Sequence, residues 1–151
     1  MNEVLLKKEI ALQLEMLDYT VQEIVLLRSD LGGKEPNRRE IAAAAAFLAD
    51  FYAGIENILK RISLFHNVEL PVGDNWHVEL FARFCTPGYP GLPVLIEEDL
   101  KGPLAAYRRF RHVVHHGYVL QLQWSRMAEG VQSIDQVYQN FKAKLQTILQ
   151  Q

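Results

Sequence analysis

The residues best suited to chemistry lie close together, between Arg108 and Tyr118. Three arginines, three histidines and one tyrosine fall within these eleven residues. From Leu100 to Ala128 the chain carries five Lys or Arg residues and no Asp or Glu to offset them. A guanidinium binds a phosphate through a rigid fork of N–H donors, and an imidazole transfers protons near neutral pH. The segment therefore predicts a site that acts on phosphodiesters.

The spacing of these side chains decides which of them can act together. On a regular helix, residues three, four and seven apart share a face. Arg109, His112 and His116 then form one stripe, whereas Arg111 and His115 belong to the adjacent stripe. Arg111 and His116 diverge by about 140° on an ideal helix. They meet only if the last turn unwinds or if they come from two different subunits.

The functional interpretation of this cluster is RNA cleavage without a metal ion. A histidine takes the proton from the ribose 2′-hydroxyl, which attacks the adjacent phosphorus, and an arginine stabilises the charge on the phosphoryl oxygens. A second histidine, for instance from a symmetry mate, protonates the leaving oxygen. Because the mechanism uses the 2′-hydroxyl, the expected target is RNA and not DNA.

Two other interpretations of the cluster stay open. Zinc could be bound by His112 and His116, which are four residues apart, or by His115. The segment has no carboxylate, however, and its arginines repel a dication, so we expect no metal and no other cofactor. In the second interpretation the cluster is structural, a solvated face or a set of partners for carboxylates elsewhere in the chain. The residues alone support the structural and the functional interpretations about equally.

The elements that position the cluster are predicted to be helices, because apolar residues recur at steps of three and four. Helices are expected over residues 2–31, 37–65, 76–84, 95–116 and 123–150. Asn2 and Asn37 are the expected N-caps of the first two, and Gly32-Gly33 ends the first. No segment alternates apolar and polar residues for long enough to be a strand. We therefore expect one all-α domain over residues 1–151, an antiparallel helical bundle of four main helices plus one short helix.

Three smaller features belong to this expected scaffold. Gly102-Pro103 is expected to kink the fourth helix or to restart it at Leu104. The acidic run 97–99 is expected to form the negatively charged first turn of that helix. The aromatic residues Trp76, His77 and Trp124 are expected to anchor the core or an interface and not to stack on bases.

Composition limits the class of protein. Hydrophobic residues make up 49% of the chain and charged residues 23%, with a net charge of −2, which is ordinary for a soluble globular domain. The single cysteine, Cys85, excludes an internal disulfide and a cysteine-based zinc site. We see neither a secretion signal nor an apolar run near the ~20 residues that a membrane span requires. A cytoplasmic protein is expected.

Arg111, four intervening residues and then His116-Gly117-Tyr118 match the pattern R-x4-H-x-Y. This pattern marks the HepT branch of the HEPN superfamily, which the chain resembles. Residues 51–62 (Phe-Tyr-Ala-Gly-Ile-Glu-Asn-Ile-Leu-Lys-Arg-Ile) resemble the second-helix signature of these proteins. Leu-Pro at 70–71 followed by Trp-His at 76–77 resembles their middle segment. The similarity in helix order and spacing covers essentially the whole chain.

The resemblance implies a HEPN-like homodimer that brings two copies of the motif into one cleft. It implies a metal-independent endoribonuclease toxin, partnered by a minimal nucleotidyltransferase antitoxin (MNT) that transfers AMP onto the motif tyrosine. Carried over to this chain, Arg111 would hold the phosphate, His116 would transfer a proton and Tyr118 would accept AMP. Arg109 fits a looser R-x4–6-H spacing, and with His112 and His115 it is a candidate supporting residue. The alternative is a non-catalytic dimeric helical module, an interaction subunit of a nucleotidyltransferase.

Overall fold

The computed structural model describes residues 2–117 and 121–150, and every long regular element in them is a helix. The helices, in chain order, are α1 (Glu3–Leu31), α2 (Arg38–Phe65), α3 (Trp76–Arg83), α4 (Glu98–His115) and α5 (Trp124–Leu149). The prediction of an all-α fold with four main helices and one short helix is confirmed.

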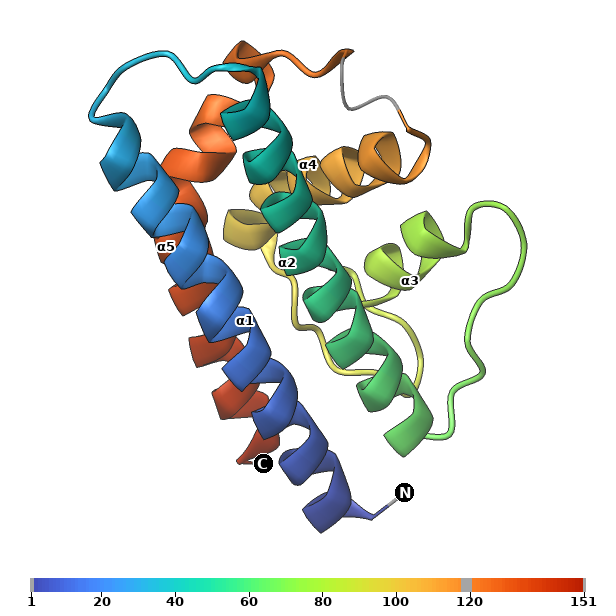
Figure 1. Ribbon diagram of the computed structural model, residues 1–151. Helices are drawn as coiled ribbons and strands as arrows, with labels where there is room; N and C mark the ends of the chain where they lie inside the picture. Colours follow the sequence, from blue (N-terminus) through green and yellow to red (C-terminus); the bar gives the residue numbers. More distant parts are fainter. Residues whose placement is uncertain (1, 118–120, 151) are drawn as a thin grey trace.

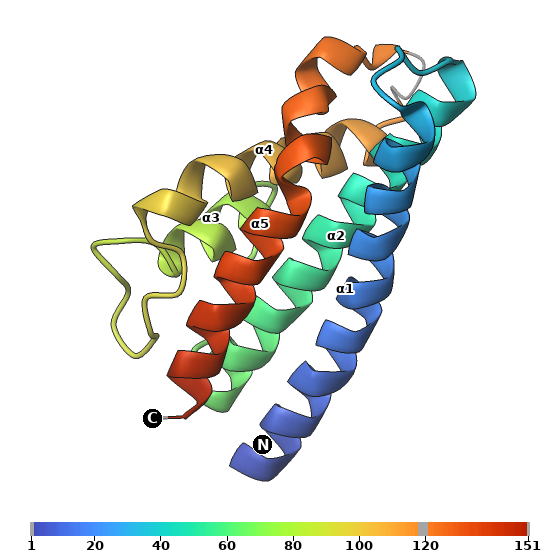
Figure 2. The ribbon, with the colours of Figure 1, turned by 90° about the vertical axis from the view of Figure 1, so that its left-hand side faces the viewer.

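Three of the long helices lie side by side as the body of the molecule. α1 runs in the opposite direction to α2 and α5, and the two ends of the chain lie at the same end of the bundle (Figures 1 and 2). α4 crosses α2 instead of running alongside it, so its C-terminal end projects toward the side of the molecule where α3 packs on α2 (Figure 1). The residues at the end of α4 are therefore presented away from α1.

The ends of the first two helices form as the sequence predicts. The side chain of Asn2 accepts a hydrogen bond from the backbone N–H of Leu5 at 2.7 Å. Asn37 and Glu40 form a reciprocal capping box, each side chain accepting from the other's backbone N–H at 2.9 Å. Gly32 ends α1 with a φ of 56°, a left-handed conformation that costs a glycine little. These local interactions fix where α1 begins and ends and where α2 begins.

α2 is the central helix and contacts all four of the others. By length and composition it could cross a membrane, contrary to the expectation that no apolar run is long enough, and 56% of its most apolar 18-residue window is buried inside the molecule. A helix with neighbours around most of its circumference must be apolar around most of it. Its position at the centre of the core therefore accounts for this composition.

α4 begins three residues later than predicted. Leu95 and Ile96 are fully buried but extended, and both of their backbone N–H groups donate to the carbonyl of Phe84, at 3.0 and 2.9 Å. The chain therefore passes through the core as a short extended segment before the helix starts. The helix then continues through Pro103 without a restart, and Glu98 and Asp99 supply its acidic first turn.

Candidate active site

α4 divides the Arg/His cluster between two faces. On the inner face, the guanidinium of Arg108 lies over the ring of Phe81, 4.9 Å from its centroid, and the side chain of Arg111 is only 20% exposed. The outer face carries the exposed members of the cluster, which are Arg109, His112, His115 and His116. The cluster is therefore divided between a partly buried face and an exposed face of α4.

Arg111 points toward a carboxylate in the core. Its Nη2 lies 3.9 Å from Oε1 of Glu56 on α2, and its Nη1 lies 3.5 Å from Nδ1 of His77 on α3. The Glu56 side chain is only 2% exposed. Burial of an ionised carboxylate costs several kcal/mol unless charge and hydrogen bonds compensate. Arg111 supplies the charge, and His77 supplies the hydrogen bond.

The proton arrangement of this group follows from its distances. Nδ1 of His77 lies 2.7 Å from Oε2 of Glu56. Because an ionised carboxylate only accepts, Nδ1 of His77 carries the proton and donates it. The 3.5 Å approach of Arg111 to the same nitrogen then joins two donors and is a close contact without a hydrogen bond. In the neutral imidazole, the lone pair is left on Nε2.

His77 is held on a second side by its own neighbour. The rings of Trp76 and His77 are in contact in a tilted arrangement, with centroids 3.5 Å apart and an interplanar angle of 32°. Nζ of Lys60 lies 4.3 Å from the centroid of the Trp76 ring, in cation–π geometry. The imidazole of His77 is thus fixed by a carboxylate and by a neighbouring indole, while its side chain keeps 30% of its surface exposed.

The guanidinium of Arg111 has N–H donors that make no hydrogen bond within the described residues. Its ion pair with Glu56 is longer than a hydrogen bond, and among the described residues its buried Nε has no acceptor. The buried hydroxyl of Tyr52 is likewise without a hydrogen-bond partner there. Burial raises the pKa of Tyr52 far above its ordinary value, and the charge of Glu56 adds to the rise, so the phenol stays protonated. Arg111 and Tyr52 therefore have donors that no partner in the described part of the chain uses, and such donors suit an anionic ligand.

His116 closes α4 at its C-terminal end. Its backbone N–H donates to the carbonyl of His112 at 3.1 Å, and its Nδ1 lies 2.9 Å from the same oxygen. Since a carbonyl accepts, Nδ1 carries the proton, and Nε2 is the basic nitrogen of the neutral ring. The rings of His112 and His116 stack with centroids 4.0 Å apart. Gly117 follows with a φ of 77°, so the chain turns away from the helix axis there.

The structure thus brings some of the predicted residues together and separates others. His112 and His116 are in contact at the helix end, whereas Arg111 is joined to α2 and α3. In residues 2–117 and 121–150, no three His, Cys, Asp or Glu side chains gather as ligands for a metal ion. Tyr118, the predicted AMP acceptor, lies outside the described residues.

Two residues of this site were not predicted from the sequence to belong to it. Glu56 is four residues after the buried Tyr52 and directly follows the buried Ile55, so the helical spacing of α2 already places a carboxylate on its core face. That pattern could have identified Glu56 as a residue in need of a buried cation. His77 was expected to be a packing anchor, and nothing in its spacing connects it with Arg111, 34 residues later.

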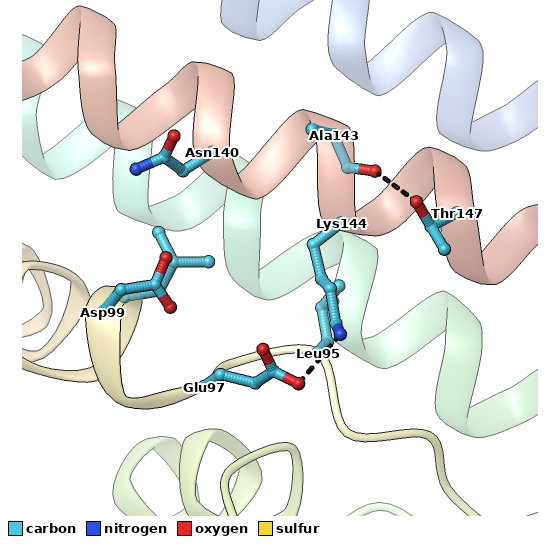
Figure 3. Close-up of a pocket in the computed structure, with 8 residues that line it drawn as sticks. Leu95, Glu97, Asp99, Asn140, Ala143, Lys144 and Thr147 are labelled. Carbon is cyan, nitrogen blue, oxygen red and sulfur yellow. Dashed lines mark hydrogen bonds and ion pairs between the residues drawn. The ribbon is translucent and has the colours of Figure 1, made fainter.

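A pocket of about 270 Å³ lies at the opposite end of α4, against α5 (Figure 3). Glu97 and Asp99 line it, and Glu97 is bound to Lys144 at 2.8 Å. Two carboxylates against one paired lysine disfavour a phosphate. This pocket is therefore a poorer candidate for a phosphate site than the Arg/His end of α4.

Comparison with protein families places this chain in a family. Residues 43–151 match the family model described as HepT-like protein, and this range includes α3, α4, α5 and most of α2. No curated protein and no solved structure matches the chain. The match covers Glu56, His77 and the whole Arg/His segment, and the all-helical architecture is the one expected of a HEPN-like domain. The chain therefore belongs to the family of HepT-like proteins.

Proposed function

We propose that this HepT-like protein is a metal-independent endoribonuclease toxin. The observation that carries the proposal is the concentration of guanidinium and imidazole groups at the C-terminal end of α4, in a chain of this family. Arg109, His112, His115 and His116 are exposed there, and Arg111 keeps unused donors. Such a surface attracts a polyanion and offers proton-transfer groups near neutral pH.

Arg111 and His116 are the proposed catalytic pair. Arg111 binds the phosphoryl oxygens and stabilises the charge that develops on them, while His116 transfers a proton through Nε2. Arg109 lies on the exposed face with His116, so it is the alternative phosphate-binding arginine. His112 supports His116 through the stacked ring and the backbone carbonyl.

The proposed site is completed by a second copy of the chain. Within one chain Arg111 is directed toward α2 and α3, while His116 is exposed at the helix end. A two-fold axis beside the end of α4 would place the His116 of one copy near the Arg111 of the other. The active form is therefore proposed to be a homodimer with RNA bound in the shared cleft.

Control of the toxin is assigned to an MNT-type nucleotidyltransferase antitoxin. The Tyr118 hydroxyl attacks the α-phosphorus of ATP, an O–P bond forms, and pyrophosphate leaves. The attached nucleotide adds bulk and negative charge two residues after His116. RNA is then excluded from the cationic cleft by volume and by repulsion.

The activity is tested by incubating purified protein with labelled single-stranded RNA in EDTA. We expect cleavage by the wild type and by His66→Ala, a matched control at the exposed end of α2, and none by His116→Ala. Full cleavage by His116→Ala would remove His116 from the mechanism. Comparison of Arg109→Ala with Arg111→Ala identifies the arginine that contacts the phosphate. On expression in cells, we expect growth arrest by the variants that cleave RNA and none by His116→Ala.

The modification is tested by mass spectrometry after incubation with ATP and the antitoxin. We expect a mass increase of one AMP group in the wild type and none in Tyr118→Phe. Modification that persists in Tyr118→Phe would refute the assignment of Tyr118.

One observation favours a second function, that of a non-catalytic dimeric interaction subunit of a nucleotidyltransferase. Arg111 already has a partner inside the chain, Glu56, so a purely structural role accounts for its position. An interaction subunit leaves the RNA intact in EDTA and still binds the nucleotidyltransferase. Cleavage that His116→Ala abolishes would exclude it.

A further inference from the structure

His77 is an imidazole at the candidate site to which the proposed function gives no role. It donates from Nδ1 to the buried carboxylate of Glu56 at 2.7 Å and contacts Arg111 at 3.5 Å. The side chain keeps 30% of its surface exposed. A carboxylate that fixes the tautomer of a partly exposed imidazole is the arrangement by which many hydrolases orient a general base.

We propose that His77 is a second catalytic residue of the ribonuclease site, the general base that removes the proton from the ribose 2′-hydroxyl. Glu56 is then a positioning residue, since it acts only through His77. The inference rests on the proposed ribonuclease function and adds the proton acceptor to it. It also supplies the second imidazole of the reaction from the same chain as Arg111.

The proton and bond changes of this step balance. Nε2 of His77 takes the 2′-hydroxyl proton as the O2′–P bond forms and the P–O5′ bond breaks. The protonated His116 gives a proton to O5′, so the products are a 2′,3′-cyclic phosphate and a 5′-hydroxyl. His77 then returns its proton to solvent, and His116 takes one up.

The charges around His77 favour the role of base over that of acid. Glu56 stabilises the imidazolium that forms when Nε2 accepts a proton, and would oppose its release. Lys60, behind the Trp76 ring, and Arg111, at 3.5 Å, are the cations on the neighbouring helices that face this group. A phosphate held by Arg111 would also lie within contact distance of the base.

A structural role would require only a hydrogen-bond donor at position 77, whereas a general base also requires a basic nitrogen. To satisfy Glu56, the residue at position 77 needs only one N–H donor near the place of Nδ1. Asparagine offers such a donor at nearly the same distance from the backbone, but it has no basic nitrogen. His77→Asn therefore separates the two roles without removing the hydrogen bond to the buried carboxylate.

The experiment measures RNA cleavage in EDTA between pH 5 and 9 for the wild type, His77→Asn and the control His66→Asn. We expect kcat of His77→Asn to fall at least about 100-fold with little change in KM, because a general base contributes about 10²–10⁴. The acidic limb of the pH–rate profile is expected to disappear, and added imidazole to restore part of the rate. His66→Asn should match the wild type, and thermal unfolding should show that both variants are folded.

Each outcome decides the matter. If the wild type cleaves RNA and His77→Asn keeps its rate and its acidic limb, His77 is structural and only this inference fails. A variant His77→Asn that raises KM and leaves kcat unchanged would likewise show that His77 is not the general base. If the wild type leaves the RNA intact, the proposed function fails and the inference falls with it. Failure of His77→Asn to fold would show that the ring itself is needed for packing, and would contradict the role argued for His77.

Discussion

Glu56→Gln is the substitution that most directly tests the buried charge group at the site. The variant keeps the size of the side chain and removes its charge. It leaves the guanidinium of Arg111 without its anion, 20% exposed, and turns an acceptor of the His77 N–H into an amide that can present a donor. The fold should therefore lose stability even though no cavity is created.

The size of the loss follows from the burial of the partners. Removal of one member of a buried ion pair costs about 3–5 kcal/mol. The lower end applies here, because Arg111 and His77 keep 20% and 30% of their side-chain surfaces exposed and water relieves part of the cost. We expect a loss of about 3 kcal/mol, or a fall in Tm of roughly 6–12 °C for a chain of this size.

The assay is urea unfolding at pH 7, followed by circular dichroism, with Glu15→Gln on the exposed face of α1 as control. The control should stay within about 0.5 kcal/mol of the wild type. Arg111→Met alone should also destabilise the protein, because it leaves Glu56 buried without its cation. The double variant Glu56→Gln/Arg111→Met should lose less stability than the sum of the two single-variant losses, by at least about 1 kcal/mol. The reason is that both substitutions remove the same interaction.

A loss in the double variant that equals the sum of the two single-variant losses within about 0.5 kcal/mol would refute this reasoning. Arg111 and Glu56 would then be neighbours without energetic coupling. A change of less than about 0.5 kcal/mol in Glu56→Gln alone would have the same meaning, since the carboxylate would then not need its partners.

Three further predictions concern packing, pH and RNA binding. Gly54→Ala should destabilise the protein by about 1–2 kcal/mol in urea unfolding, because the new Cβ would lie 2.6 Å from Cδ2 of the buried Leu17 and the gain in helix propensity offsets only part of the strain; an unchanged midpoint would contradict this. The hydrogen bond from Arg28 lowers the pKa of Asp135, so this carboxylate stabilises the fold above about pH 4 and loses that effect as the pH falls through its folded pKa. Asp135→Asn should therefore cost about 0.5–1 kcal/mol at pH 7, a small value because the side chain is half exposed, and less at pH 2; an equal loss at the two pH values would contradict this. Arg109→Ala should weaken RNA binding and reduce the slope of log K against log salt by about 0.7 in fluorescence anisotropy, and an unchanged slope would mean that Arg109 makes no phosphate contact.

The sequence by itself determined the helices and the chemical character of the site. The caps at Asn2 and Asn37 and the left-handed end at Gly32 depend on hydrogen bonds that span only a few residues, so the local sequence specifies them. The Arg/His cluster is equally local, because consecutive turns of one helix supply its members. The family match over residues 43–151 agrees with the resemblance carried by R-x4-H-x-Y.

Only the tertiary structure decided which side chains surround Arg111. Its contacts with Glu56 and His77 join α4 to α2 and α3, and their existence depends on the way in which α4 crosses the central helix (Figure 1). The late start of α4 has a similar cause, since Leu95 and Ile96 are buried in the core and donate to the carbonyl of Phe84, which lies far from them in the sequence. Helical periodicity describes neighbours three and four positions apart, whereas a buried charge finds its partner through the packing of whole helices.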